Sequence, residues 1–335
     1  MESPTNQPKE IPYPEIINQN SEWLYRLGAF RAAIYLKLWE KVARGSDTAE
    51  RIADQEGWDL AGTRVLLDSV CAMKLMKKEG DRYSLTTEAA MYLDPAQPTY
   101  RGDLWLFEFN WEGDGKLADV IRTGKRPLFY DATKEEMTGV WKAHYSRGWV
   151  FPEVLVELAD ELWRSVDIQA RDGLRVLDVA CGPAPRSLAL AYHNASVRLT
   201  WLDWNEVLQT ALKAASKVGI TDQISPLPGD LWLADMGANQ YDVAYLGNMT
   251  HFFSPEQNIH LFSKIHSALV SGGIIVVNSG VRREDVAAIW DAIWLYVATA
   301  HGGSYNFIEY KEMLEQAGFT NIEDINLGPI RAVKP

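Results

Sequence analysis

Two acidic residues at the ends of apolar runs are the first indication of chemistry in this chain. Asp178 lies in VLDVACGPAP, which begins at residue 176, and Asp203 lies in LTWLDWNEVL, which begins at residue 199. A tight turn and a helix expected to begin near Ser187 separate the two runs. Strand, turn, helix and a second strand with a terminal acid are typical of a nucleotide-binding crevice at the carboxyl edge of a parallel sheet. The second acid is then placed to bind ribose hydroxyls.

The turn itself argues against a dinucleotide. It reads A-C-G-P-A-P over residues 180–185, with Gly182 as its single glycine. It therefore lacks the G-x-G-x-x-G pattern that brings a pyrophosphate to a helix N-terminus. Asp178, just before the turn, would also repel a pyrophosphate. A cofactor that carries an adenosine and a cationic, amino-acid-like tail fits these residues better.

These residues resemble the S-adenosylmethionine-dependent methyltransferases, and the resemblance implies S-adenosylmethionine as the cofactor. By this resemblance Gly182 approaches the methionine part of the cofactor, and Asp178 orders the turn or meets the ammonium group through water. Asp203 binds the ribose, and Trp204 lies against the adenine.

The segment P-G-D-L-W, residues 228–232, follows a third expected strand and extends this cofactor site. Asp230 is expected to accept the adenine amino group, while Leu231 and Trp232 cover the ring. Asn248, at the end of the fourth strand, is expected beside the reacting carbon. The alternative is that these are ordinary strand-end and turn residues, but two strand-end acids and a Gly-Asp at these intervals seldom coincide.

Alternating strands and helices predict an α/β fold, with a Rossmann-like parallel sheet in the C-terminal part of the chain. The strands are expected at Arg175–Val179, Arg198–Asp203, Ile224–Leu227, Tyr241–Gly247 and Gly273–Asn278. We expect a flexible tail over residues 1–14, a mainly helical domain over 15–100, a helical connector that contributes to the substrate pocket over 101–170, and the cofactor domain over 171–335.

The expected N-terminal domain has a winged-helix pattern of two helices and a small hairpin. Ser46 or Asp47 is expected to cap the first of these helices, Gly57 to end it and Asp59 to open the second. A DNA-binding regulator is the competing interpretation. Residues 1–100 contain 12 Lys and Arg against 15 Asp and Glu, a net charge of −3. Phosphate binding requires a basic face, so protein contact is favoured over DNA.

The whole arrangement resembles the small-molecule O-methyltransferases, in which a winged-helix dimerisation domain precedes the methyltransferase domain. VLDVACGPAP, LDWNEVL, PGDLW and GNMTHFFSPEQNIHLFSKIHSALVSGG all look like motifs of that family. The resemblance implies a homodimer whose N-terminal domains interlock. The turn departs from the family's G-x-G-x-G, with Ala180 and Ala184 around Gly182. Alanine is tolerable at these two positions if its φ stays negative.

His251 occupies the place of the family's catalytic base, just after the fourth strand. By the resemblance, glutamates further along should orient that histidine. Here the first is replaced by Asn278 and the second by Tyr305 or Asn306. Without a carboxylate, an imidazole loses the group that fixes its tautomer and stabilises its cation. His251 is therefore either a catalytic base or a structural or substrate-positioning residue.

The missing glutamates leave the acceptor atom open. Oxygen is the usual acceptor of the family, but a thioether sulfur, such as that of a thioether acid on a dimethylsulfoniopropionate-type pathway, needs no deprotonation and yields a sulfonium. A family member that does not methylate and a cofactor-sensing regulator are further alternatives. The many aromatic residues of the chain favour the sulfonium product, because aromatic faces stabilise cations. Candidate substrate-binding residues are Trp105, Phe109, Trp141, His144, Tyr145, Arg147, Trp149, Trp294 and Tyr305.

Arg147 is the candidate that could bind a substrate carboxylate through two parallel hydrogen bonds. A surface ion pair with Glu135 or Glu136 is an equally good interpretation. A metal site built on His251 and His301 lacks a third ligand at a useful spacing.

Composition limits the partners. The 335 residues are 47% hydrophobic and carry a net charge of −12, which disfavours nucleic acid and anionic membranes. No apolar run is long enough to span a bilayer, and the N-terminus has no signal core. We therefore predict a cytoplasmic protein whose partners are a small-molecule substrate and a second copy of itself.

Overall fold

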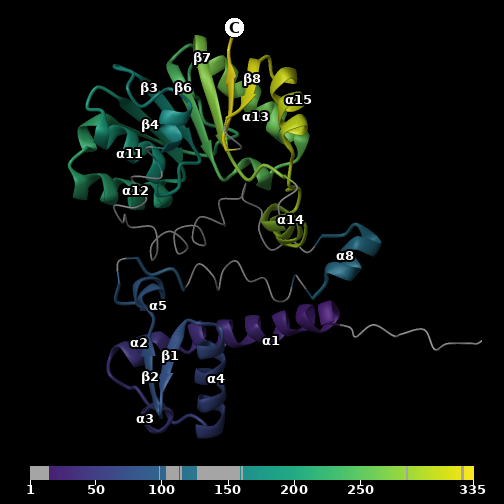
Figure 1. Ribbon diagram of the computed structural model, residues 1–335. Helices are drawn as coiled ribbons and strands as arrows, with labels where there is room; N and C mark the ends of the chain where they lie inside the picture. The colour runs from purple at the N-terminus through teal and green to yellow at the C-terminus, as the bar shows by residue number, and fades with distance from the viewer. Residues whose placement is uncertain are drawn as a thin grey trace, which may run out of the picture. The chain divides into compact units, whose positions relative to one another are not determined.

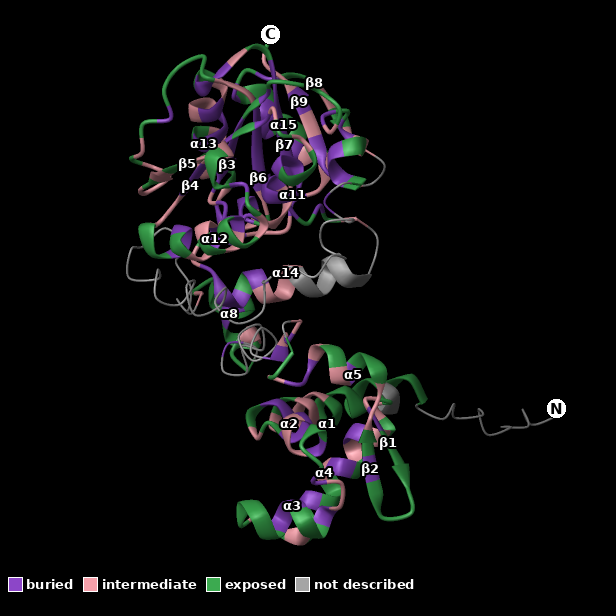
Figure 2. Cartoon of the chain, turned by 90° about the vertical axis from the view of Figure 1, so that its left-hand side faces the viewer, coloured by how far each residue is buried: buried purple, intermediate pink, exposed green. Residues whose placement is uncertain are grey.

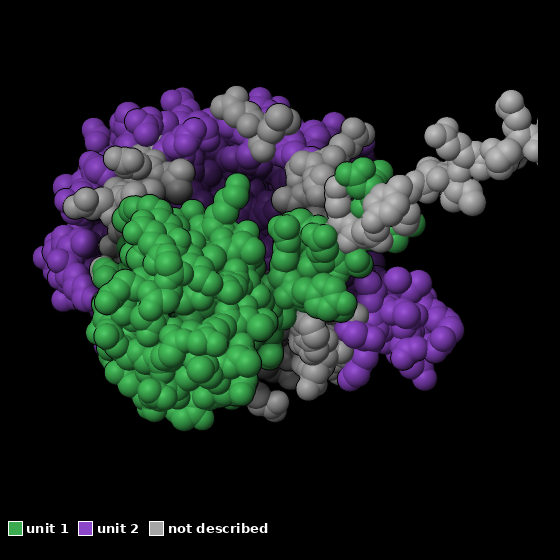
Figure 3. Space-filling model, turned by 60° about the horizontal axis from the view of Figure 1, so that its bottom comes forward, with its two compact units in different colours: residues 1–106 green, residues 107–335 purple. Residues whose placement is uncertain are grey.

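The computed structural model describes residues 15–97, 99–102, 113, 115–126, 159, 161–283, 286–325 and 328–335. The chain forms two compact units, Met1–Leu106 and Phe107–Pro335 (Figure 3). No helix in the described ranges is both long and apolar enough to cross a membrane.

The first unit contains a winged-helix arrangement (Figure 1). Its elements are α1 (Glu15–Tyr35), α2 (Leu38–Ala43), α3 (Ala49–Glu56), α4 (Leu60–Ala72), β1 (Met76–Glu79), β2 (Arg82–Leu85) and α5 (Thr87–Tyr92). β1 and β2 pair as an antiparallel hairpin, with Met76 opposite Leu85. The helices and the hairpin share a core in which Leu38, Trp39 and Leu67 are at most 1% exposed.

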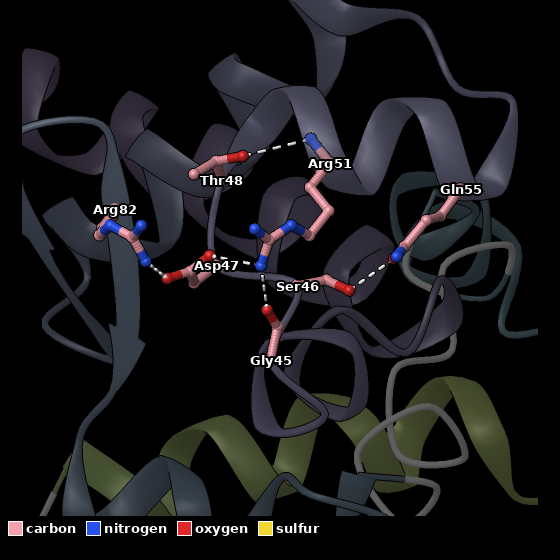
Figure 4. Close-up of polar contacts among 7 residues, drawn as sticks. All are labelled: Gly45, Ser46, Asp47, Thr48, Arg51, Gln55 and Arg82. Atoms are coloured by element: carbon pink, nitrogen blue, oxygen red, sulfur yellow. Dashed lines mark hydrogen bonds and ion pairs between the residues drawn. The ribbon is translucent and has the colours of Figure 1, made fainter.

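Thr48 caps α3, so the expectation of Ser46 or Asp47 is wrong. Thr48 has the extended backbone of a cap, and its side-chain oxygen accepts a hydrogen bond from the amide of Arg51 at 3.2 Å. Asp47 forms ion pairs with Arg51 and Arg82 instead, and so connects the start of α3 to β2 (Figure 4). The hydroxyl lies one residue closer to the first helical turn than sequence spacing alone indicated.

The second unit contains a seven-stranded sheet of order β5-β4-β3-β6-β7-β9-β8. Its strands are β3 (Arg175–Val179), β4 (Arg198–Asp203), β5 (Ile224–Pro228), β6 (Tyr241–Gly247), β7 (Leu269–Asn278), β8 (Thr320–Asp324) and β9 (Ile330–Val333). The strands β3 to β7 are parallel, whereas β9 pairs antiparallel with both β7 and β8. This mostly parallel sheet confirms the predicted α/β fold.

Helices cover both faces of the sheet, because residues along a strand alternate between its faces. In β3, Val176 packs with α11 (Pro185–His193) and α12 (Asn205–Val218), whereas Leu177 packs with α13 (Pro255–Ala268) and α15 (Phe307–Gln316). Buried residues run along the central strands in Figure 2. The second unit also contains α8 (Leu117–Thr123), α14 (Val286–Ala298) and two 3-10 turns, η2 (Thr221–Gln223) and η3 (Thr250–Phe252).

Candidate active site

The turn after β3 carries an unusual backbone. Ala180, Gly182 and Ala184 have φ angles of +52°, +56° and +54°. The condition under which alanine would be tolerated here, a negative φ, is therefore not met. The left-handed conformation places a Cβ close to the following carbonyl and costs an alanine roughly 1 kcal/mol. These left-handed residues allow the chain to turn between the end of β3 and the start of α11 at Pro185.

Asp203, at the end of β4, lies across this turn. One carboxylate oxygen accepts a hydrogen bond from the amide of Gly182 at 2.8 Å, and the other accepts one from the amide of Trp204 at 2.7 Å. Burial raises the pKa of Asp203 to about 6, although both amides act in the opposite direction. Asp203 therefore connects the two strand ends and presents its carboxylate to the pocket that they form.

Asp178 lies deeper and is only 2% exposed. It accepts a hydrogen bond from the hydroxyl of Ser187, and that hydroxyl in turn accepts one from the indole nitrogen of Trp201 at 3.0 Å. Burial raises the pKa of Asp178 to about 7. These contacts connect Asp178 to the start of α11 and to β4, and its role toward the cofactor stays a prediction.

The loop after β5 is fixed by a lysine that sequence reasoning missed. Lys264, from α13, donates hydrogen bonds to the carbonyl oxygens of Leu231 at 2.9 Å, Trp232 at 2.7 Å and Ala234 at 3.2 Å. Asp230 accepts a hydrogen bond from the amide of Trp232 at 2.7 Å. Partial burial lowers the pKa of the Lys264 ammonium group. In the sequence the only signal is a lysine beside the apolar residues of an amphipathic helix.

A pocket lies at the carboxyl edge of the sheet, with an empty volume of about 600 Å³ that opens to solvent. It is lined by Ala180, Leu202, Asp203, Trp204, Gly229, Leu231, Gly247, Asn248, Met249, Phe252 and Phe253. The predicted residues Asp203, Trp204, Leu231 and Asn248 thus meet around one cavity. Trp232 is not among the lining residues and packs on Phe253, with ring centres 5.0 Å apart.

His251 lies in η3, between the pocket-lining residues Met249 and Phe252 in the sequence. Its ring centre is 4.6 Å from that of Phe252. Burial lowers the pKa of His251 to about 4, so the imidazole is neutral at pH 7. Among the residues that the structure describes, no group forms a hydrogen bond with this imidazole.

The backbone around His251, by contrast, is held from several elements. The hydroxyl of Thr250 lies 2.7 Å from those of Ser279 and Tyr310, and Asn258 donates to the Thr250 carbonyl at 2.9 Å. The carbonyl of His251 accepts a hydrogen bond from the amide of Gly303 at 2.9 Å. These buried contacts fix the backbone of His251. Its imidazole contacts the ring of Phe252 but has no hydrogen-bond partner among the described residues.

The sequence also matches two family models that bear on this site. Residues 176–273 match a methyltransferase domain, and residues 24–95 match an O-methyltransferase dimerisation domain. The chain belongs to the S-adenosylmethionine-dependent O-methyltransferase family. Its members are methyltransferases of small molecules, and S-adenosylmethionine is their cofactor.

Several individual proteins resemble this chain over nearly its whole length. The 3-hydroxy-5-methyl-1-naphthoate 3-O-methyltransferase of Streptomyces sahachiroi is 23% identical over 96% of this chain and 94% of its own. The L-tyrosine C(3)-methyltransferase of Streptomyces lavendulae is 28% identical over 88% of this chain and 85% of its own. The crystal structure of a putative O-methyltransferase from Nostoc punctiforme has a TM-score of 0.80 at 24% identity, covering 97% of this chain and 100% of that one.

The residues of the pocket fit S-adenosylmethionine. Asp203 supplies a carboxylate beside the left-handed turn, as ribose hydroxyls require, and Leu202, Leu231 and Phe252 supply apolar walls for an adenine. The described residues contain no group of three or more His, Cys, Asp or Glu side chains that could hold a metal ion.

The expected acidic partners of His251 are replaced by residues with other contacts. Asn278 donates a hydrogen bond to the hydroxyl of Tyr245 at 3.1 Å, and Asn306 caps α15. Tyr305, predicted to contact substrate, is 8% exposed and donates its hydroxyl to the carbonyl of Phe253 at 2.6 Å. Tyr305 thus holds the segment that carries His251 through the carbonyl of Phe253.

Of the other predicted substrate residues, the structure describes Trp294. Trp294, on α14, lies against Phe252 with ring centres 6.0 Å apart. Seven predicted substrate residues lie outside the described residues: Trp105, Phe109, Trp141, His144, Tyr145, Arg147 and Trp149.

Proposed function

We propose that this enzyme transfers a methyl group to an oxygen atom of a small aromatic acceptor, with His251 as the proton acceptor. The observation that carries the proposal is a neutral imidazole on the segment that also forms the cofactor pocket wall at Asn248, Met249 and Phe252. The names of three relatives support oxygen: the naphthoate 3-O-methyltransferase, a tetracenomycin polyketide 8-O-methyltransferase and an acetylserotonin O-methyltransferase.

S-adenosylmethionine, when bound, supplies a methyl group on a positively charged sulfur that leaves as a neutral thioether. Asp203 would accept hydrogen bonds from the ribose. Lys264 holds the loop of Leu231, which would lie against the adenine. The acceptor hydroxyl gives its proton to the imidazole of His251, while its oxygen forms the new bond to carbon. Thr250 and Asn258 keep the histidine backbone fixed, so the protein acts mainly through positioning.

The deprotonation that we assign to His251 is assisted only weakly by the imidazole itself. A base whose conjugate acid has a pKa of about 4 gives little driving force against an ordinary phenol. A thioether acceptor avoids this step, and the replacement of both expected glutamates favours that second candidate. S-methyl transfer to a thioether acid therefore stays the alternative to O-methyl transfer.

Mass spectrometry of a metabolite panel incubated with labelled cofactor separates the two candidates. The panel contains phenols and thioether acids, and the labelled product identifies the methylated atom. For an oxygen acceptor we expect His251→Ala to lower kcat about 100-fold, the low end for a positioned base, because the imidazole is a weak base. The affinity for S-adenosylmethionine should be unchanged by calorimetry. A sulfonium product, or a flat pH profile with a modest loss in His251→Ala, would overturn the oxygen assignment.

We also propose that the enzyme is a homodimer whose contact includes α1. This helix exposes large apolar side chains: Ile16, Ile17, Trp23, Leu24 and Tyr25 are 57–75% exposed. Several exposed large apolar side chains on one helix are typical of a protein contact, and the matched dimerisation domain begins at residue 24. Light scattering should give a dimer, and Trp23→Glu with Leu24→Glu should shift it to a monomer. The exposed neighbour Glu22→Gln serves as the control, and a monomeric wild type would contradict the proposal.

A further inference from the structure

Arg126 is a cation that the mechanism above does not use. It follows the C-terminus of α8 and is partly buried. One guanidinium nitrogen donates a hydrogen bond to the carbonyl of Gly302 at 2.6 Å. The guanidinium carbon lies 4.1 Å from the ring centre of Tyr296 on α14. A carbonyl and an aromatic face therefore fix the position of this charge.

No carboxylate among the described residues lies within ion-pair distance of Arg126. Other arginines of the second unit differ: Arg122, at the end of α8, pairs with Asp119, and Arg283 pairs with Asp324. The chain has 45 acidic residues against 33 Lys and Arg, so acids are plentiful. Arg126 is partly buried and pairs with none of the described acidic residues. Its positive charge is therefore available to an anion from outside the chain.

The position of Arg126 connects it to His251. The turn that accepts its hydrogen bond continues into Gly303, whose amide donates to the His251 carbonyl at 2.9 Å. A Cβ atom at Gly302 would lie 2.4 Å from that same carbonyl oxygen, so the turn is in direct contact with the histidine backbone. The charge of Arg126 also reaches Tyr305, where it opposes the upward shift of the pKa that burial produces.

We infer that Arg126 binds a carboxylate of the methyl acceptor and thereby selects hydroxyaryl carboxylates over neutral hydroxyaryl compounds. The inference rests on the proposed O-methyl transfer and names its substrate class. A guanidinium has five N–H donors, of which Gly302 occupies one. The others can form the two parallel hydrogen bonds that a carboxylate favours.

The pairing also matters for the weak base at this site. An unpaired substrate carboxylate would raise the pKa of a nearby hydroxyl, because a like charge disfavours the ionised form. By pairing with that carboxylate, Arg126 would offset its charge and so leave the acceptor proton easier to transfer to the His251 imidazole.

The test compares hydroxynaphthoic acids with their methyl esters as probes. In the wild type, kcat/KM should be higher for the acids than for the esters. In Arg126→Gln the acids should lose about 10- to 100-fold, as expected for one charge-assisted pair, whereas the esters should change less than about threefold. Arg126→Lys should restore part of the loss. Arg122→Gln, at an exposed cation of α8, is the matched control and should behave as wild type.

Binding measurements test the role of Arg126 independently of methyl transfer. Calorimetry with enzyme saturated in S-adenosylhomocysteine should show tighter binding of the acids than of the esters, and Arg126→Gln should abolish the difference. Equal binding of acid and ester in the wild type, or a preference that survives in Arg126→Gln, would overturn the inference. Binding of the acids that depends on Arg126 without any methylated product would contradict the proposed O-methyl transfer and support the anion site.

Discussion

The residues proposed to bind the cofactor, around Asp203, and the residues around His251 are held by contacts of different range. We refer to them as the cofactor side and the acceptor side. The carboxylate of Asp203 binds the amide of Gly182, 21 residues away in the sequence. The segment of His251 depends on Tyr305 and Tyr310, whose hydroxyls contact it across 52 and 60 residues. The cofactor side therefore rests largely on neighbouring strand ends, and the acceptor side on elements that only the complete fold brings together.

Because of this difference, we expect substitutions on the two sides to change different quantities. Changes to the cofactor side should alter the affinity for S-adenosylmethionine. Changes to the contacts behind His251 should lower kcat while cofactor affinity is preserved. A substitution that moved both quantities equally would show that the two sides act as one unit.

The largest effect is expected from Gly302→Ala. The added Cβ would lie 2.4 Å from the His251 carbonyl oxygen and 2.5 Å from the Thr299 hydroxyl, so the backbone must move. We expect kcat to fall at least 100-fold, because displaced catalytic groups lose that much, with cofactor affinity within about threefold of wild type. Gly280→Ala is the control, since nothing lies within 4 Å of its Cβ position. Full activity of Gly302→Ala would show that the histidine position is not critical.

Asp203→Ala should produce the next largest effect. It removes the carboxylate that lines the pocket and leaves the amides of Gly182 and Trp204 without their acceptor. We expect the Kd for S-adenosylmethionine to rise about 100-fold, which corresponds to about 2.7 kcal/mol, as measured by calorimetry. Asp222→Asn, at an exposed acid of η2, should leave Kd unchanged. Unchanged binding in Asp203→Ala would make the cofactor assignment of this residue wrong.

The pH dependence of binding follows from the raised pKa of Asp203, about 6 in the folded chain. The folded state holds this proton more tightly than the unfolded state, so this group stabilises the fold as pH falls from about 6 toward 4. Cofactor affinity should change in the opposite sense and weaken below about pH 6, because binding uses the carboxylate. Calorimetry between pH 5 and pH 8 measures this change, and the dependence should disappear in Asp203→Asn.

Lys264→Met should have an intermediate effect, again on the cofactor side. The loss of three hydrogen bonds to the carbonyls of Leu231, Trp232 and Ala234 should loosen the loop that lines the pocket. We expect the Kd for S-adenosylmethionine to rise about 10-fold, with little change in kcat at saturating cofactor. Lys213→Met, at an exposed position of α12, is the control. A fall in kcat with unchanged Kd would place Lys264 on the acceptor side instead.

The smallest effect is expected from Ala180→Gly. Glycine adopts a φ of +52° without strain, and Ala180 is only partly buried, so the free energy of unfolding should rise by up to about 1 kcal/mol. Ala184→Gly relieves the same strain but removes a methyl group that is 1% exposed, and its net change should be near zero. Thermal unfolding of the cofactor-free protein compares the two. Destabilisation by both variants would show that the left-handed alanines carry no strain.

The sequence allowed much of the cofactor side to be predicted, because its residues follow apolar strands at regular spacing. The five parallel strands were predicted within a few residues, and Asp203, Trp204, Leu231 and Asn248 line one pocket. The strands β8 and β9 were not predicted, since they are only five and four residues long and are partly exposed. The positive φ of the alanines was also missed, because residue type argues against it.

The acceptor side was less accessible to sequence reasoning. The absence of an acid at Asn278 could be read directly, but its hydrogen bond to Tyr245 depends on the pairing of β6 with β7. The hydroxyl of Tyr305 contacts the carbonyl of Phe253, and no local pattern indicates such a pair. Lys264 and Arg126 were missed for the same reason, since both bind backbone carbonyls, which leave no trace in the sequence.

One short segment belongs to both sides. Asn248, Met249, Phe252 and Phe253 border the cofactor pocket, and His251 lies among them. A shift of this segment by one ligand must change the binding free energy of the other, and thermodynamic linkage makes that coupling equal in both directions. The factor by which the cofactor strengthens acceptor binding should therefore equal the factor by which the acceptor strengthens cofactor binding. Because of the single shared wall, each reactant would then be retained more tightly while the other is bound.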